Sequence, residues 1–367
     1  MTIPKKKYKI ALVGYSLNKG GLEKVISNLS LMFGENDFEI HNIILNNDIG
    51  YSYSGKLVNI EKRLAKYPFL KLLKYIYLFF YFRKFKFDYI IDLRFRLNPI
   101  TEIIICKLIY NTKVVFSVQS SRIGTYFFEN RMLTKFIYNK NYAIVCGSKG
   151  IEKELIKKHS LNNVKTIYNT INIEKIKEKA KEEINIAFRY IVSVGRFEKQ
   201  NIKQFDKLIE TYLQTDLKNK NIHLVIVGEG ETLNDFKERF DEEKFVHLIG
   251  FKSNPYAYMN KAEFFVLTSK YEGFGMVLAE ALACGTPVIS FDCQTGPNEI
   301  IIHKKNGLLV KSQDFNELKD AVERFVSDIN LLESCKNRAE NSVVKFDVNT
   351  ITNNWIELLN NKNKNEH

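Results

Sequence analysis

The chain has 367 residues, 45% of them hydrophobic, which is enough for two packed cores at about 100–200 residues per domain. No apolar run approaches the about 20 residues of a membrane-spanning helix, and the first residues lack the pattern of a secretory signal. The five cysteines form no Cys-x-x-Cys pair and no zinc pattern, so we expect buried thiols in a reducing cytoplasm.

Charge is divided unevenly along the chain. The net charge is +13. Residues 1–170 hold 28 Lys and Arg against 12 Asp and Glu, a net of +16, which leaves −3 for residues 171–367. This asymmetry predicts a basic face on the first half of the chain.

Short apolar runs of strand length alternate with amphipathic stretches in both halves. The first half contains YKIALVGY, FEIHNIIL, FDYIIDL, TKVVFSV and YAIVCGS, and the second contains RYIVSVGR, IHLVIVGEG, FVHLIGF, EFFVLTS and TPVISFD. Buried strands that alternate with helices predict βαβ units and parallel sheets. We therefore expect two Rossmann-like α/β domains, residues 1–170 and 171–345, followed by a helix within 346–367.

The loop after the first predicted strand ends in Gly20 and Gly21 and leads into a helix. Such a pair lets the backbone approach a phosphate or a sugar. The loop is not the dinucleotide fingerprint G-x-G-x-x-G, and no acidic residue follows it in the ribose-binding role.

The stretch Lys66–Phe87 combines six basic residues and ten aromatic residues with no acidic one. This composition predicts an interfacial helix on an anionic membrane, where each basic residue contributes about 1 kcal/mol. The alternative is a core helix whose lysines extend to solvent, and both can hold for different faces. Aromatic residues packed this densely disfavour nucleic-acid binding. The membrane candidates are Lys71, Lys74, Arg83, Lys84 and Lys86.

The second series of strands opens with VSVGRFEKQNIKQFDKLIE. Arg196 directly follows the predicted strand, where its planar fork can reach a diphosphate together with a lysine. Lys203 and Lys199 are the two candidates for that lysine. Ordinary surface charge is the alternative for both lysines.

The stretch SKYEGFGMVLAEALACGTPVIS places Glu272 and Glu280 on either side of a Gly-Phe-Gly turn after a predicted strand. In open α/β sheets, ligands bind outside the carboxyl ends of the strands. Glycines let the backbone approach a ligand, and the free N–H groups of a helix that starts near Met276 favour an anion. Carboxylates accept hydrogen bonds from hydroxyls, so a nucleotide-sugar fits. The alternative is a plain turn with a solvated helix carboxylate. The candidate donor residues of this stretch are Glu272, Gly273, Phe274, Gly275, Met276, Val277 and Glu280.

The motif YEGFGMVLAEALACGTPVIS, followed by TGPNEII and NGLLV, resembles the donor site of the retaining family 4 glycosyltransferases that build bacterial cell-surface polysaccharide and lipopolysaccharide. This family has the GT-B fold, in which the parallel sheets of two Rossmann-like domains face each other across a cleft. The resemblance implies that Glu272 holds the donor sugar and Glu280 the ribose. It also implies that Arg196 and a lysine hold the diphosphate. Lys203 fits the segment that follows the family's lysine but requires a longer loop, so Lys199 remains a competitor.

The same resemblance bears on the first domain. The Gly20-Gly21 loop resembles the family's glycine loop, which faces the donor. Gln119 stands where the family often carries a histidine near the reacting sugar, and glutamine cannot carry a proton in catalysis. It is therefore a candidate sugar or acceptor contact, or alternatively a plain strand-end residue. No Asp-x-Asp and no paired metal-ligand histidines occur, which favours a metal-free mechanism in which Arg196 and Lys203 stabilise the leaving diphosphate.

The resemblance implies a retaining enzyme that moves a hexose or N-acetylhexosamine from a UDP-sugar to a glycan or lipid-linked acceptor. It would act without a cofactor, at the inner face of the cytoplasmic membrane, in the synthesis of capsule, O-antigen or lipopolysaccharide. The acceptor would enter between the domains, and the C-terminal helix would cross back to the first domain. The alternatives are a GT-B nucleotide-sugar epimerase and a non-catalytic membrane- or glycan-binding protein.

Overall fold

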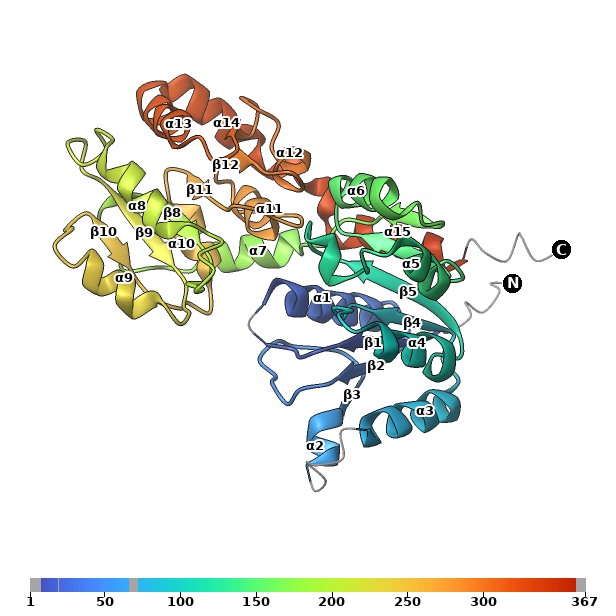
Figure 1. The fold of residues 1–367 in the computed structure, drawn as a ribbon. Coiled ribbons are helices and arrows are strands. Elements are labelled where there is room, and N and C mark those ends of the chain that lie inside the picture. The colour runs from blue at the N-terminus through green and yellow to red at the C-terminus, as the bar shows by residue number, and fades with distance from the viewer. Residues whose placement is uncertain (1–7, 19, 66–71, 361–367) are drawn as a thin grey trace, which may run out of the picture. The chain divides into compact units, whose positions relative to one another are not determined.

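A computed structural model describes residues 8–18, 20–65 and 72–360 and divides the chain into two compact units (Figure 1). The first unit is formed by residues 1–170 and 351–367, and the second by residues 171–350. The second unit extends past residue 345, where we expected it to end. Its last residues belong there because Ile171 N–H donates to Phe346 O at 3.0 Å and the Phe346 ring lies 5.0 Å from that of Phe274.

Within its described residues, the first unit is a seven-stranded parallel sheet in the order β3-β2-β1-β4-β5-β6-β7. The strands are β1 Lys9–Gly14, β2 Glu39–Ile44, β3 Lys56–Asn59, β4 Tyr89–Asp92, β5 Lys113–Val118, β6 Ala143–Cys146 and β7 Val164–Thr166. The helices are α1 Gly21–Glu35, α2 Ile60–Leu64, α3 Leu73–Phe85, α4 Pro99–Ile104, the π-helical turn η1 Ile105–Ile109, the 3₁₀ turn η2 Ile123–Thr125, α5 Arg131–Tyr138 and α6 Lys149–His159.

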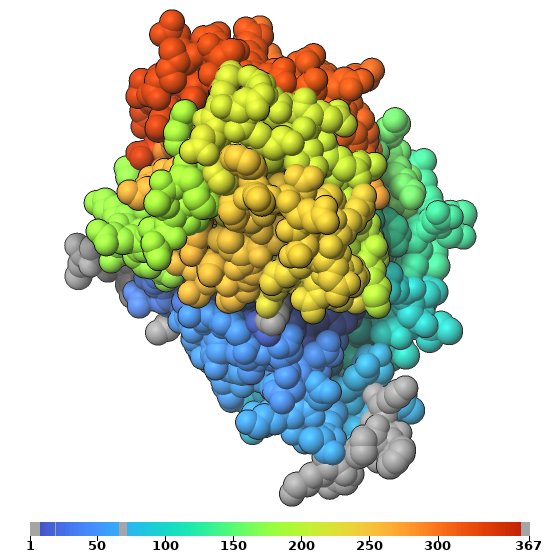
Figure 2. All heavy atoms as spheres, turned by 90° about the vertical axis from the view of Figure 1, so that its left-hand side faces the viewer, coloured from blue at the N-terminus to red at the C-terminus, as the bar shows by residue number. Residues whose placement is uncertain are grey.

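The second unit, over the residues that the structure describes, contains a six-stranded parallel sheet in the order β10-β9-β8-β11-β12-β13. The strands are β8 Arg189–Val194, β9 Ile222–Val227, β10 Val246–Leu248, β11 Phe265–Leu267, β12 Val288–Asp292 and β13 Gly307–Lys311. The helices are α7 Ile173–Ala180, α8 Phe205–Leu213, α9 Leu233–Arg239, α10 Pro255–Lys261, α11 Met276–Ala283, α12 Pro297–Ile300, α13 Phe315–Ser327, α14 Ile329–Ser342 and the 3₁₀ turn η3 Val344–Phe346. Figure 2, viewed from the β10 side, shows the outer surface that α9 and its neighbouring loops (yellow to gold) form on this unit.

Both sheets are built from strands that are apolar on both faces. Ile10, Ala11 and Leu12 of β1 are fully buried, and so are Leu224 and Val225 of β9. Strands covered by helices on both faces read as continuous apolar runs, which is why the sequence predicted a parallel α/β architecture. All five cysteines are free thiols, four of them buried and Cys106 half-buried.

The last helix, α15 Val348–Asn360, starts in the second unit and ends in the first. Trp355 is buried and packs edge-on against Phe33 of α1, with ring centroids 5.8 Å apart. The Tyr142 hydroxyl donates to Leu358 O at 2.8 Å. Figure 1 shows α15 (red) beside the green elements of the first unit, although they lie far apart in the sequence.

In residues 8–18, 20–65 and 72–360, no helix has both the length and the apolarity that a bilayer span requires.

Candidate donor-binding site

Three loops of the second unit meet at the carboxyl edge of its sheet, after β8, β11 and β12. The strand order reverses between β8 and β11, since β8 leads to β9 on one side while β11 leads to β12 on the other. Ligands of doubly wound sheets bind at such a switch point. The loop after β8 carries Arg196 to Lys203, and the loop after β11 carries Glu272. This edge of the sheet is therefore the candidate donor site.

Lys203 and Glu272 lie together at the centre of this edge. The Lys203 ammonium Nζ lies 2.5 Å from Glu272 Oε1, and both side chains are mostly buried. The Ser269 hydroxyl donates to the same carboxylate oxygen at 2.7 Å. The Lys203 backbone is also fixed, because the Thr268 hydroxyl donates to Lys203 O at 2.7 Å. The loops after β8 and β11 thus hold a paired cation and carboxylate in a defined place.

The glycine turn between Glu272 and α11 is shaped by the loop after β12. The Thr295 hydroxyl donates to Glu272 O at 2.5 Å. A Cβ at Gly296, whose φ is 96°, would lie 2.4 Å from Phe274 O, so only glycine allows this approach. Gly275, with φ at 90°, then turns the chain into α11. The Phe274 side chain is buried in the core, which leaves only its backbone for a ligand.

Helix α11 presents the remaining donor candidates. Gly275 is its N-cap, and Met276 and Val277 are half-buried in its first turn. Glu280 lies about one turn further along and accepts a hydrogen bond from the Tyr256 hydroxyl of α10 at 3.3 Å. The unpaired N–H groups and the dipole at a helix start favour an anion.

Arg196 and Lys199 have other partners in the structure. Arg196 Nη1 lies 3.4 Å from Glu198 Oε1, and its side chain is 56% exposed. Lys199 Nζ lies 3.2 Å from Glu231 Oε2 and is 78% exposed. We expected Arg196 to reach a diphosphate, and in the structure its side chain pairs with Glu198. Exposed ion pairs contribute about 0–1 kcal/mol, so Arg196 can exchange this partner for a diphosphate at little cost.

Three glycines beside Arg196 were not singled out from the sequence. A Cβ at Gly228 would lie 1.7 Å from Gly195 O, and one at Gly230 would lie 2.1 Å from Phe197 O. The loops after β8 and β9 therefore touch backbone to backbone, and Phe197 N–H donates to Glu229 O at 3.0 Å. The Gly-Glu-Gly directly after a strand in IHLVIVGEG was the signal that pointed to this contact.

The candidates in the first unit lie at the carboxyl edge of its own sheet. Gly20 is the N-cap of α1, in extended conformation at φ −166°, and Gly21 is its first residue. Gln119 follows β5, and its amide Nε2 donates to the Ser117 hydroxyl at 2.7 Å. Its Oε1 is buried and has no hydrogen-bond partner among the described residues. The Gln119 side chain therefore retains an oxygen that can still accept a hydrogen bond.

The basic stretch Lys66–Phe87 forms helix α3, apart from residues 66–71, which include Lys71 and lie outside the described residues. One side of α3 is core, where Leu78 and Phe82 are buried. The other side exposes Ile76 and Phe80 by 52% and 64%. The core alternative thus holds for one face of this helix, and membrane binding by the exposed face stays a prediction. Lys74 is half-buried, whereas Arg83, Lys84 and Lys86 are exposed.

The exposed side of α3 continues onto two neighbouring elements. The Arg83 Nη2 donates to Leu108 O of η1 at 2.8 Å, and Lys107 Nζ donates to Phe136 O of α5 at 2.9 Å. Each of these elements exposes large apolar side chains. We call the set the apolar face: Leu72, Ile76, Phe80, Leu108, Met132 and Phe136. The one carboxylate in α3, α4, η1 and α5 is Glu102, which is buried.

Comparison with known proteins decides the family. The model of the group 1 glycosyl transferases matches residues 174–342, which include the whole site around Glu272. A Campylobacter jejuni relative, N-acetylgalactosamine-N,N'-diacetylbacillosaminyl-diphospho-undecaprenol 4-alpha-N-acetylgalactosaminyltransferase, is 33% identical over 370 residues and is matched over 96% of this chain and 99% of its own. The chain belongs to the group 1 glycosyl transferases.

Another sequence relative and two solved structures are similar to this group 1 glycosyl transferase over nearly its whole length. The amylovoran biosynthesis glycosyltransferase AmsD of Erwinia amylovora is 25% identical over 356 residues, matched over 94% of this chain and 97% of AmsD. A mutant of TarM from S. aureus, solved with Fondaparinux, alpha-GlcNAc-glycerol and UDP, superposes with a TM-score of 0.76 at 16% identity over 96% of this chain and 100% of TarM. HepE of Anabaena, solved with UDP, gives 0.75 at 18% over 96% and 100%. The group 1 glycosyl transferase described here has the GT-B fold, as expected.

Proposed function

We propose that this glycosyltransferase is a retaining enzyme that moves a hexose or N-acetylhexosamine from a UDP-sugar to a glycan or lipid-linked acceptor in cell-surface polysaccharide synthesis. The observation that carries the proposal is the Lys203–Glu272 pair, 2.5 Å apart at the switch point of the second sheet and beside the start of α11. Such a site offers a cation and helix N–H groups to a diphosphate and a carboxylate to sugar hydroxyls.

The proposed roles follow from these charges. Glu272 accepts hydrogen bonds from the donor sugar, and Glu280 accepts them from the ribose. Lys203 turns from Glu272 to the diphosphate when the donor binds, and Arg196 gives up Glu198 to join it. Two cations and the start of α11 then stabilise the charge that grows on the leaving diphosphate, without a metal ion.

The acceptor hydroxyl attacks the anomeric carbon of the donor sugar on the face that the diphosphate leaves, and the bond between that carbon and the diphosphate oxygen breaks. One diphosphate oxygen takes the proton of the acceptor hydroxyl as the new glycosidic bond forms. The anomeric configuration of the donor is retained by this route without a carboxylate nucleophile. On the first unit, the side-chain oxygen Oε1 of Gln119 accepts a hydrogen bond from the sugar or from the acceptor substrate.

A lipid-linked acceptor is supported by two observations. The C. jejuni relative is named for a diphospho-undecaprenol substrate. The elements that carry the apolar face also carry Lys74, Arg83, Lys84, Lys107, Arg131 and Lys135, and a surface that combines apolar and basic side chains binds an anionic bilayer. The enzyme would then lie at the inner face of the cytoplasmic membrane, where a polyprenyl-linked glycan is presented.

The test uses purified enzyme and a panel of UDP-, GDP- and dTDP-sugars, first for binding by thermal shift and then for transfer to a polyprenyl-diphosphate-linked glycan. We expect a UDP-hexose or UDP-N-acetylhexosamine to bind and an α-linked product to form, as read by nuclear magnetic resonance. An inverted linkage would overturn the retaining mechanism. An isomerised sugar formed without acceptor would identify an epimerase, and the lack of any nucleotide binding would identify a non-catalytic protein.

A further inference from the structure

A buried arginine stands at the centre of the first unit's carboxyl edge. Arg96 has no exposed surface. Four aromatic rings surround its guanidinium carbon at 5.0 to 5.7 Å, those of Phe116, Tyr126, Phe127 and Tyr138. Ring faces attract a cation, which offsets part of the cost of taking the charge out of water. Within the described residues, its Nη2 has no hydrogen-bond partner.

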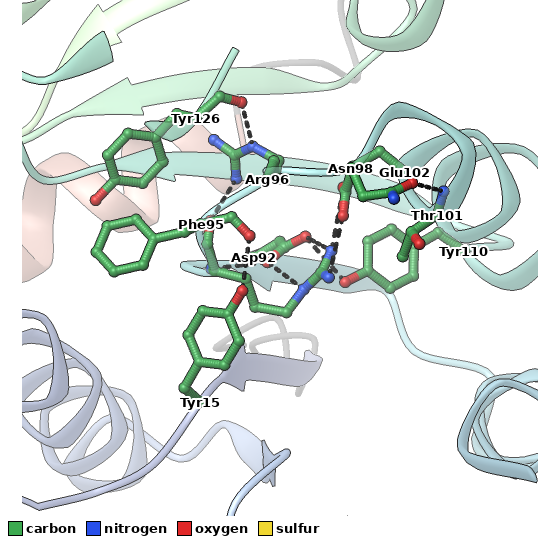
Figure 3. Close-up of polar contacts among 10 residues, drawn as sticks. Tyr15, Asp92, Phe95, Arg96, Asn98, Thr101, Glu102, Tyr110 and Tyr126 are labelled. Atoms are coloured by element: carbon green, nitrogen blue, oxygen red, sulfur yellow. Dashed lines mark hydrogen bonds and ion pairs between the residues drawn. The ribbon is translucent and has the colours of Figure 1, made fainter. Parts of the chain in front are cut away.

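The remaining donors of Arg96 join two loops. Its backbone N–H donates to Thr125 O at 2.8 Å, and its Nε donates to Tyr126 O at 3.0 Å. Its Nη1 donates to Arg94 O at 3.2 Å. Figure 3 shows the guanidinium between the backbone of its own loop and the Tyr126 carbonyl. The side chain therefore fixes the loop after β4 to the loop after β5, and these two strands are neighbours in the sheet.

The loop fixed in this way begins with Gln119. It runs through the 3₁₀ turn η2 to Tyr126, whose N–H donates to Ile123 O at 2.9 Å. On the other side, the Tyr15 hydroxyl after β1 donates to Phe95 O at 2.9 Å (Figure 3). The loops after β1, β4 and β5 are thus joined in a row, with Arg96 between the last two.

The nearby Arg94 makes different contacts, with residues close to it in the sequence. Arg94 pairs with Asp92 at 2.7 Å and with Glu102 at 3.2 Å, both of them buried. Burial works against a charged Asp92, but the Arg94 and Arg96 guanidinium groups hold the pKa of Asp92 below its usual value. The Tyr110 hydroxyl adds a hydrogen bond to Asp92 at 3.0 Å. The Arg94 cluster stabilises the start of the loop after β4. The Arg96 side chain, in contrast, bonds to the loop after β5.

An apolar side chain would fill the aromatic cage at a lower cost of desolvation than an arginine does. What it would lose are the directional side-chain bonds from Nε to Tyr126 O and from Nη1 to Arg94 O. We propose that Arg96 is a positioning residue for the acceptor: it holds the loop after β5 so that Gln119 is presented at the carboxyl edge. The proposal rests on the acceptor role proposed above for this edge.

The test is a double-mutant cycle on the purified enzyme, with acceptor KM and kcat measured at saturating donor. We expect Arg96→Met to raise acceptor KM about tenfold and to leave UDP affinity within twofold of the wild type, because UDP is bound by the second unit. Gln119→Ala should raise acceptor KM by a similar factor. The double variant should be no worse than Gln119→Ala, since Arg96 acts through Gln119.

Two controls separate positioning from general stability. Ile144→Ala opens a cavity in β6 of the same sheet, lowers the melting temperature and should leave acceptor KM unchanged. Arg96→Lys keeps the charge in the cage but not the fork, and it carries the same prediction as Arg96→Met should the latter not fold. Multiplying effects in the double variant, or an unchanged acceptor KM in both Arg96 variants of an enzyme whose wild type is active, would overturn the proposal. Failure of the wild type to use any acceptor would instead refute the proposed function.

Discussion

At the scale of single residues, Glu272 is the most constrained polar group at the proposed donor site. Lys203 and Ser269 contact its carboxylate, and Thr295 contacts its backbone, so three loops converge on one residue. A carboxylate held this firmly loses no freedom when sugar hydroxyls bind to it, which is the physical basis of preorganisation.

The first prediction concerns Glu272→Gln, which keeps the size of the side chain but removes its charge. We expect kcat for transfer to fall by about 10²–10³-fold, with a melting temperature close to that of the wild type. The measurement is product formation from the UDP-sugar identified by the panel. Glu231→Gln is the matched control, because Glu231 is an exposed carboxylate paired with a lysine at the same edge. Transfer at the wild-type rate in Glu272→Gln would refute its role.

The second prediction distinguishes the two candidate lysines. Lys203→Ala should weaken UDP binding about tenfold or more in a calorimetric titration, because a charge-assisted contact to the diphosphate is lost. Lys199→Ala should change UDP affinity less than twofold, since Lys199 is exposed and paired with Glu231. A larger loss in Lys199→Ala than in Lys203→Ala would reverse the assignment.

The sequence predicted which residues lie at this site more completely than it predicted how their side chains and loops are arranged. The motif and the strand order placed Lys203 and Glu272 at one sheet edge, and they lie together there; their roles in donor binding stay predictions. The side-chain direction of Arg196 could not be read from sequence, because an exposed arginine takes the partner nearest to it, here Glu198. The Gly-Glu-Gly after β9 indicates that another backbone segment comes close, but that this segment is Gly195 depends on how two loops cross, which the local pattern does not encode.

At the scale of elements, the sequence predicted ten of the strands and missed β3, β7 and β13, which lie at sheet edges. β3 and β7 begin with exposed or half-buried residues and show no continuous apolar run, whereas the run in β13 was assigned to the motif NGLLV and not to a strand. The change from α4 to the π-helical turn η1 was also not predicted, because the apolar run TEIIICKLIY has the same composition on both sides of it.

The third prediction belongs to helix α3. Replacing Lys71, Lys74, Arg83, Lys84 and Lys86 by Gln should reduce binding to vesicles that contain anionic lipid, with each basic residue contributing about 1 kcal/mol. Phe80→Ser together with Phe136→Ser should weaken binding to the same vesicles further, because it removes two side chains of the apolar face. Sedimentation with vesicles measures both effects.

The control for this experiment replaces exposed lysines of the second unit, Lys220, Lys237, Lys244 and Lys336, by Gln. It removes four positive charges from the other unit, and binding should change little. Equal losses in both variants would mean that net charge alone drives the association.

The fourth prediction concerns the histidine pair at β9 and β10. His223 Nδ1 lies 2.9 Å from His247 Nε2, and both rings stack on Phe188 at 4.1 and 4.6 Å. Burial lowers the pKa of both, and His223 lowers that of His247 further. The unfolded chain takes up these protons at a pH of about 6.5 and the folded one only below it, so stability is complete above that pH and falls as pH drops.

We therefore expect the melting temperature to decline between about pH 6.5 and pH 5. His223→Phe should make this decline shallower, because phenylalanine keeps the stacking and does not titrate. Scanning fluorimetry across this pH range makes the comparison, with the buried His41 and His159 retained in both proteins. A decline of equal steepness would show that the pair does not contribute to acid sensitivity.

At the scale of the whole molecule, two parallel sheets in succession and the GT-B architecture were both predictable. The apolar runs fixed the α/β class, and the resemblance of the stretch after β11 supplied the fold, which the likeness to TarM and HepE then confirmed. The strand orders were not predicted, because right-handed βαβ connections leave open which strands become neighbours.

The fifth prediction is metal independence of the complete reaction. We expect the transfer rate to be unchanged in excess EDTA, because Arg196, Lys203 and the start of α11 supply the positive charge that a divalent ion would otherwise bring to the diphosphate. The assay compares initial rates with and without chelator. Recovery of a lost activity on adding Mg²⁺ or Mn²⁺ would contradict this electrostatic account.

The path of α15 has a consequence for how the protein is made. A ribosome releases residues 1–170 long before it reaches Trp355, yet that tryptophan fills a place against Phe33 in the same unit. The apolar surface that Trp355 covers in the first unit therefore stays uncovered while the second unit is synthesised. Completion of the first unit depends on residues that are synthesised after the whole second unit, so a stop codon ahead of Trp355 would leave the surface around Phe33 uncovered.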